Sequence, residues 1–266
     1  AEDYVQSEGA ALQFFPYHPF RQESFEERLA ELRGRSIQRE KLAQVIEEFM
    51  EPFSPTPRQR EELKHLRDET SVVVIGGQQA GLLTGPMYTL YKIVTILQVA
   101  RQQKERLGVP VVPVFWIAGE DHDFQEINHV YLPAKEEGRM EKIVLSFPEE
   151  VRRPISRRNL PLDELNTWLE EVFLHLKETD FSPELRTVIT QAAQRSETYV
   201  DFFAFLIQHY FGEEGLLFID SAYPALRELE AEHFVQIIEG YDEIDAKIRD
   251  AWAKMKEAGY PPQVNL

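Results

Sequence analysis

Three short apolar runs along the chain have the length and composition of strands. They are Val72–Ile75, Val111–Ala118 and Leu216–Ile219, built largely from β-branched, aromatic and leucine side chains. The second run has no alternation, which is typical of a strand that is covered on both faces of a parallel sheet. We therefore predict a parallel sheet, and a further strand at Lys142–Phe147.

Between the first two strands the apolar positions change to helical spacing. A helix is predicted from about Met87 to Leu107, and Gly108 ends it. Its apolar face consists of Leu90, Ile93, Val94, Leu97 and Ala100. Strand, helix and strand at this spacing predict a right-handed βαβ unit, so the expected fold class is α/β.

The rest of the chain is predicted to be mostly helical. A capping box at Thr56–Gln59 starts one helix before the sheet. Later helices are predicted to start at Leu162, Ser182 and Ser196, and to cover about Pro224–Ile238 and Asp242–Ala258. We divide the chain into an aromatic and helical segment at 1–70, an α/β core at 71–240 with a helical insertion at about 150–212, and a helical segment at 241–266.

A glycine-rich loop connects the first strand to the helix that follows it. The stretch Ser71–Tyr91 has no charged residue, and its glycines are Gly76, Gly77, Gly81 and Gly85. Glycine permits positive φ and close approach of a ligand, and Pro86 suits the first turn of a helix whose free N–H groups face the loop. The polar side chains of Gln78, Gln79 and Thr84 also favour binding, so we predict a pocket for a nucleotide or a carboxylate. The Walker A lysine and the dinucleotide glycine spacing are absent, and the alternative is an ordinary tight connection.

Acidic and histidine side chains follow the second strand directly, in the segment Glu120–His129. The carboxyl ends of parallel strands form one edge of a sheet, so this segment should lie beside the glycine loop. His122 is a candidate for proton transfer, with Asp121 or Asp123 to fix its tautomer and raise its pKa.

Two other interpretations of this segment stay open. In a helix, His122, Glu126 and His129 would share one face and could bind a metal ion. The spacing of zinc proteases is absent, so we assign no metal ligands. Alternatively, the acids only cap and solvate the N-terminus of a helix.

Further candidate polar groups lie at the end of the third strand and in the middle of the chain. Asp220 and Ser221 end the third strand, where an acid can hold a ribose hydroxyl or a substrate ammonium group. A basic patch is formed by Arg152, Arg153, Arg157 and Arg158. These arginines could clamp a carboxylate or a phosphate, or they could form a solvated loop in which surface charges contribute little.

The composition excludes several classes of function. The chain of 266 residues has 46 acidic and 29 basic side chains, and its net charge of −17 repels nucleic acid, so we predict no nucleic-acid partner. It has no cysteine, which excludes disulfides and thiolate metal sites and fits a reducing compartment. Glycines and a proline interrupt the uncharged stretch and no basic segment precedes it, so we predict no signal peptide and no membrane span.

Four motifs of the chain are distinctive: Gly77–Pro86, Pro113–His129, Tyr17–Pro19 and Ile219–Ser221. They resemble the bacillithiol synthase family, and the resemblance covers nearly the whole chain. It implies a Rossmann-like core similar to class I aminoacyl-tRNA synthetases and nucleotidyl transferases, with helical insertions. It also implies a coiled-coil arm for dimerisation, which would start in the segment 241–266. Chains of the family continue beyond Leu266, so this sequence resembles their N-terminal half.

The resemblance further implies a cytoplasmic ligase that joins cysteine to the amine of glucosaminyl malate and forms a homodimer at full length. On this interpretation His122 is the catalytic base, and Asp121 and Asp123 orient it or hold the substrate ammonium group. The predicted binding residues are Gly77, Gln78, Gln79, Gly81, Thr84, Gly85, Tyr88, Glu120, Asn128, His129, Asp220 and Ser221. The 266-residue chain alone is expected to be inactive.

The cofactor is unknown from the sequence, and the candidate is a nucleotide, ATP or ADP. The synthetases and transferases that the family resembles hold the nucleotide with a His-x-x-His signature. Tyr88 and Tyr91 occupy the comparable place here, which counts against adenylation. Two alternative functions are a nucleotidyl transferase-like enzyme that uses ATP and a non-catalytic scaffold with the same fold.

Overall fold

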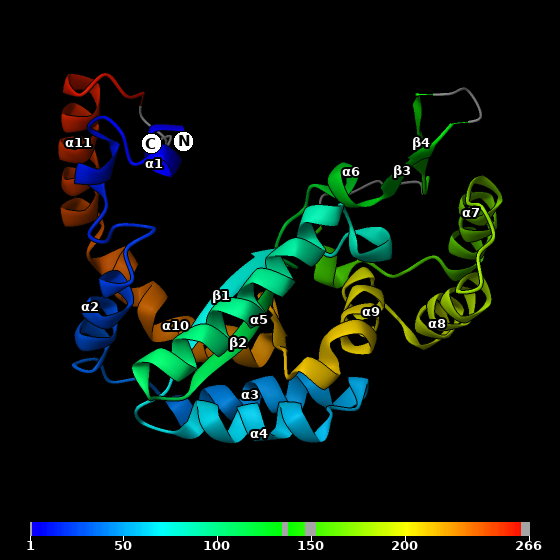
Figure 1. Ribbon diagram of the computed structural model, residues 1–266, viewed down its shortest axis with the longest axis horizontal. Helices are drawn as coiled ribbons and strands as arrows, with labels where there is room; N and C mark the ends of the chain where they lie inside the picture. Colours follow the sequence, from blue (N-terminus) through cyan, green and yellow to red (C-terminus); the bar gives the residue numbers. More distant parts are fainter. Residues whose placement is uncertain (1, 135–137, 147–152, 262–266) are drawn as a thin grey trace. The chain divides into compact units, whose positions relative to one another are not determined.

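Three parallel strands form the central sheet of the computed structural model, which describes residues 2–134, 138–146 and 153–261. The strands are β1 (Val72–Gln78), β2 (Val111–Ile117) and β5 (Leu217–Asp220), in the order β1-β2-β5. Figure 1 labels β1 and β2 beside the helix that connects them. The central strand β2 is buried almost throughout, as its unbroken apolar run predicted. The predicted parallel sheet and its three strands are therefore confirmed.

The connection between β1 and β2 is the predicted helix α5 (Met87–Leu107), which packs against both strands. Gly108 ends it in the left-handed conformation, with φ 66°. Ile93 and Ala100 are buried as predicted, but Val94 is exposed. Strand, helix and parallel strand thus form the expected βαβ unit.

Two helices that precede the sheet in sequence pack against it. They are α3 (Arg39–Met50) and α4 (Pro57–Arg67), which contact each other and β5. The predicted capping box of α4 is present, because the Thr56 hydroxyl accepts the N–H of Gln59 at 3.2 Å. Short 3-10 helices occur at η1 (Ala11–Phe14), η2 (Glu51–Phe53), η3 (Leu82–Thr84), η4 (Ile155–Arg157) and η5 (Gly212–Glu214).

The helical insertion contains α7 (Leu162–His175), α8 (Ser182–Arg195) and α9 (Tyr199–Phe211). The first two begin where the sequence predicted. The third begins later than Ser196, because Thr198 and not the serine forms its capping box.

A separate two-stranded sheet lies between the βαβ unit and the insertion in sequence. After the short helix α6 (Phe124–Ile127), strands β3 (His129–Pro133) and β4 (Met140–Val144) pair antiparallel. The strand predicted at Lys142–Phe147 therefore begins earlier, ends earlier and does not join the parallel sheet. Phe147 lies outside the described residues.

The chain divides into two compact units. One is Gln38–Arg227, which contains both sheets; the other combines the residues up to Ile37 with those from Glu228 onward. The second unit includes α1 (Glu2–Gln6), α2 (Glu23–Leu32), α11 (Tyr241–Glu257) and most of α10 (Pro224–Glu239). The sequence placed boundaries at 70 and 240 instead; residues 38–70 group with the sheet because α3 and α4 pack on it. Within the described residues, no helix is both long and apolar enough to cross a membrane.

Candidate functional site

The loop between β1 and α5 has a strained backbone. Leu83, Thr84 and Gly85 follow one another with φ of 51°, 74° and 73°. Positive φ is costly for a β-branched threonine, and strain of this kind occurs mainly at functional sites. The prediction that the other loop glycines also use positive φ is wrong, since Gly81 has φ −72° and extended backbone.

Gly81 and Gly77 are required for close packing rather than for positive φ. A Cβ atom on Gly81 would lie 2.7 Å from the Cα of Gly85, so the loop closes tightly on itself. A Cβ atom on Gly77 would lie 2.5 Å from the backbone oxygen of Trp116 on β2. These glycines therefore fix the shape of the loop, in which Thr84 is buried.

A chain of hydrogen bonds joins this loop to the segment after β2. The ammonium group of Lys92 donates to Oε1 of Gln78 at 2.8 Å, and Nε2 of Gln78 donates to Oε1 of Gln79 at 2.9 Å. Nε2 of Gln79 in turn donates to the carboxylates of Asp121 at 2.8 Å and Glu126 at 2.6 Å. The expected juxtaposition of the two segments is confirmed.

Lys92 is a further candidate residue of this site that was not predicted from the sequence. It is the first charged residue after the uncharged stretch, and it lies one helical turn beyond Tyr88. Its position on the first turns of the helix that follows the glycine loop could have identified Lys92 from the sequence. Its ammonium group also lies over the Tyr88 ring, 5.2 Å from the centroid.

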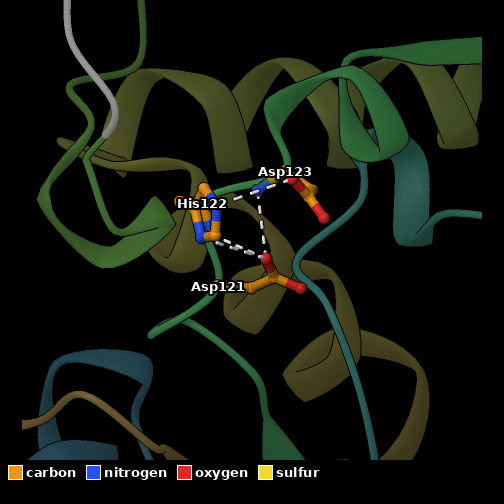
Figure 2. A group of neighbouring side chains, drawn as sticks. All are labelled: Asp121, His122 and Asp123. Carbon is orange, nitrogen blue, oxygen red and sulfur yellow. Dashed lines mark hydrogen bonds and ion pairs between the residues drawn. The ribbon is translucent and has the colours of Figure 1, made fainter. Parts of the chain in front are cut away.

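Asp121, His122 and Asp123 form a compact cluster at the carboxyl end of β2 (Figure 2). The His122 ring lies beside both acids, with Nδ1 4.0 Å from Asp121 and Nε2 3.8 Å from Asp123. These distances exceed hydrogen-bonding range, so neither acid fixes the tautomer of the imidazole through a hydrogen bond in this structure. The His122 side chain is half exposed and therefore accessible to a substrate.

The Asp121 carboxylate organises the turn that carries His122. Burial alone would raise the pKa of Asp121, but hydrogen bonds to its carboxylate outweigh this effect and hold the pKa below its usual value. The donors are the N–H of Asp123, the amide of Gln79 and the N–H of His122. Asp121 is therefore a stable anion beside the imidazole.

Among the described residues, Asp121, His122 and Asp123 are the one group of three acidic or histidine side chains that lie close enough together to bind a metal ion. One ligand atom from each of Asp121, His122 and Asp123 lies within 4.8 Å of the others. The helical arrangement of His122, Glu126 and His129 considered from the sequence is wrong. Helix α6 covers only Phe124–Ile127, and His129 belongs to β3.

A cavity of about 720 Å³ lies between the glycine loop, α6, β3 and α7. Of the predicted binding residues, it is lined by Gln78, Gln79, Gly81, Gly85, Tyr88 and His129. The other lining residues are Leu83, Pro86, Met87, Glu126, Ile127, Val130, Tyr131, Leu132, Val172 and Leu176. A mostly apolar wall with a few convergent polar groups is typical of a small-molecule site. The contribution of β3 and α7 was not predictable before their packing was known.

Six predicted binding residues and the Asp121–Asp123 cluster do not line this cavity. Gly77 and Thr84 belong to the glycine loop, and the other four lie elsewhere. Asn128 is buried and donates to the backbone oxygen of Leu145 at 3.3 Å, so it ties the end of α6 to the residue that follows β4. The N–H of Glu120 donates to the hydroxyl of Ser221 at 3.3 Å, which joins the ends of β2 and β5. Asp220 lies beside Ser221 and lines a second, smaller cavity.

The basic patch is not a single clamp in this structure. Arg158 stacks on the Phe124 ring at 4.9 Å from its centroid, and Arg157 lines the second cavity. Arg152 lies outside the described residues.

His129 gives the larger cavity a pH-sensitive group. Burial lowers the pKa of His129 below its ordinary value, and the positive charge of Lys142 adds to this shift. A neutral imidazole can donate one hydrogen bond and accept another, as a polar group of a substrate requires.

We expect His129 to make folding stability pH-dependent. The unfolded chain takes up the proton more readily than the folded chain, so the free energy of unfolding should fall as the pH drops through the ordinary histidine pKa of about 6.5. His129→Gln should lose this contribution. Urea denaturation of both proteins at a series of pH values tests this, and a constant difference between them across that range would contradict it.

Comparison with known proteins identifies relatives along the whole chain. The family model described as "Bacillithiol biosynthesis BshC, N-terminal Rossmann-like domain" matches residues 1–266. A protein of Bacillus cereus (strain B4264) named "Putative cysteine ligase BshC" is 40% identical over 260 residues, which are 98% of this chain and 48% of that protein. A protein of Geobacillus thermodenitrificans with the same name is 37% identical over 268 residues, which are 100% of this chain and 49% of that protein. The chain thus spans about half the length of the curated relatives that it matches.

Proposed function

This chain belongs to the bacillithiol biosynthesis BshC family and matches its N-terminal Rossmann-like domain, and from this premise we propose that the protein is a ligase. The reaction is the formation of an amide bond between the carboxyl group of cysteine and the amine of glucosaminyl malate. The observation that carries the proposal is the hydrogen-bond chain from Lys92 to Asp121, which joins the glycine loop to the His122 cluster beside a cavity of about 720 Å³.

The charges around this cavity suit glucosaminyl malate, which has two carboxylates on its malate part and an amine on its sugar part. Met87 and Tyr88 at the N-terminus of α5 line the cavity, and the ammonium group of Lys92 is bonded to Gln78 in its wall; both favour the malate carboxylates. Glu126 also lines the cavity, and the Asp121 carboxylate is bonded to Gln79 in its wall; both favour a cationic amine. Gly77, Gln78, Gln79, Gly81, Thr84 and Gly85 form the loop proposed to bind the anionic group.

His122 is the proposed base of the reaction. An amine attacks only in its neutral form, so a group near it must accept the proton that it loses. The imidazole of His122 is accessible, and Asp121 and Asp123 stabilise the imidazolium that forms. A nucleotide, ATP or ADP, is the proposed cofactor, and its phosphate chemistry would activate the cysteine carboxyl group.

We also propose a cytoplasmic homodimer at full length, without a nucleic-acid partner. On α11, Ile244, Ile248, Ala251 and Met255 recur at helical spacing, and none of these side chains is buried in the described chain. Such a stripe suits a coiled-coil contact with a second copy.

The proposed reaction is tested with the full-length protein, L-cysteine, glucosaminyl malate and ATP. The expected result is the amide product, detected by mass spectrometry, with release of phosphate. Release of pyrophosphate would favour a nucleotidyl transferase mechanism. Failure to form the amide with any nucleotide would contradict the ligase proposal and favour a scaffold.

We expect the 266-residue chain alone to form no amide product, because about half the length of its relatives lies outside it. The assay compares product formation by the 266-residue chain and by the full-length protein under conditions in which the full-length protein is active. Turnover by the 266-residue chain at a similar rate would contradict this prediction.

A further inference from the structure

A second cavity, of about 300 Å³, lies at the carboxyl end of β5. Its walls come from α3, η2, η4, α9 and the beginning of α10. The apolar part of the wall is formed by Phe49, Pro52, Phe53, Val200, Tyr223 and Pro224. No step proposed above uses this cavity.

A buried carboxylate faces this cavity. The Asp220 side chain lines it although the residue is only 5% exposed. Oδ1 of Asp220 accepts the N–H of Ala222 at 3.0 Å. Burial raises the pKa of Asp220, while the Ser156 hydroxyl and the Ala222 N–H oppose this shift. A buried carboxylate is more stable as an anion when a cationic group binds beside it.

A guanidinium group lines the same cavity. Arg157 is exposed, and among the described residues its side chain makes no hydrogen bond and no ion pair. Guanidinium groups bind carboxylates through two parallel hydrogen bonds. The cavity therefore presents one guanidinium and three carboxylates, Glu48, Asp201 and Asp220, together with an apolar wall. Asp220 is the buried one of the three; the Asp201 carboxylate accepts the N–H groups of Glu197 and Thr198, and that of Glu48 accepts from Gln44.

We infer that this cavity binds a free α-amino acid, with Asp220 holding its ammonium group and Arg157 its carboxylate. The inference rests on the proposed function, under which that amino acid is cysteine. The apolar wall suits a small, weakly polar side chain such as the cysteine thiol. The smaller cavity would thus hold the smaller substrate and the larger cavity glucosaminyl malate.

The order of the strands supports two substrate sites. The glycine loop after β1 lines the larger cavity, and the end of β5 lines the smaller one. The Asp121–Asp123 cluster follows β2, which lies between β1 and β5 in the sheet. Gly119, two residues before Asp121, packs against the side chain of Asp220, because a Cβ atom on Gly119 would lie 2.1 Å from Oδ1 of Asp220. The Asp121–Asp123 cluster, which contains the proposed base, would then follow the strand that lies between the two substrates in the sheet order.

Calorimetry with L-cysteine on the full-length protein tests the inference. Arg157→Gln and Asp220→Asn should each weaken L-cysteine binding by about 10- to 100-fold, the usual effect of losing a hydrogen bond to a charged group. Arg153→Gln is the matched control, since it removes an exposed arginine of the same segment that does not line the cavity. Glucosaminyl malate binding should be unchanged in all three variants.

Two analogues assign the two contacts separately. Cysteamine lacks the carboxylate, so its binding should be insensitive to Arg157→Gln, and N-acetylcysteine lacks the ammonium group, so its binding should be insensitive to Asp220→Asn. Wild-type affinity for L-cysteine in Arg157→Gln would overturn the inference, even if Asp220→Asn fails to fold. If L-cysteine binds as predicted but no amide forms, the proposed reaction fails and the amino-acid site stands. If amide forms and Arg157→Gln leaves L-cysteine binding unchanged, the site fails and the reaction stands.

Discussion

His122→Asn is expected to lower kcat for amide formation by about 100- to 10,000-fold, with little change in the KM for glucosaminyl malate. Asparagine retains a hydrogen-bonding group near the position of one ring nitrogen but cannot accept the proton of the attacking amine. The His122 side chain is half exposed, so the substitution should leave the fold intact. Steady-state kinetics of the full-length enzyme measure the effect, with circular dichroism as the control for folding.

Other roles for His122 give different results in the same experiment. A structural histidine would reduce stability and leave the activity per folded molecule nearly unchanged. A metal ligand would make Asp121→Asn and His122→Asn fail alike, and a chelator would then inactivate the wild type. Unchanged kcat in His122→Asn would remove this residue from the catalytic role.

Gly81→Val is expected to abolish detectable binding of glucosaminyl malate. Its Cβ atom would lie 2.7 Å from the Cα of Gly85, so the loop that lines the larger cavity must open or shift. The displaced loop would move Gln78 and Gln79 away from their hydrogen-bond partners on both sides. Calorimetry with glucosaminyl malate and with malate measures the loss.

Gly34→Val is the matched control for this substitution. A Cβ atom on Gly34 meets only the backbone oxygen of Glu31, at an ordinary 3.8 Å, and Gly34 lies outside the unit that contains the cavity. It should bind glucosaminyl malate like the wild type. Normal binding by a folded Gly81→Val variant would mean that the loop is only a turn.

The parallel sheet was predictable because its signal is local. Unbroken apolar runs marked β1, β2 and β5, and a capping box marked the start of α4. The meeting of the glycine loop with the segment after β2 was also predictable, because parallel strands place their carboxyl ends at one edge.

The features that could not be predicted depend on tertiary contacts. Positive φ at Leu83 and Thr84 is imposed by the folded loop, since neither residue type favours it. The antiparallel pairing of β4 with β3 depends on a partner strand with no clear apolar pattern of its own. The lining of the larger cavity by Val172 on α7 likewise arises from packing between distant segments.

A structure of the full-length protein crystallised with glucosaminyl malate tests the central claim most directly. We predict the ligand in the larger cavity, with its malate carboxylates toward Gln78 and the start of α5 and its amine toward the Asp121–Asp123 cluster. A ligand bound elsewhere, with this cavity empty at saturating concentration, would contradict the account.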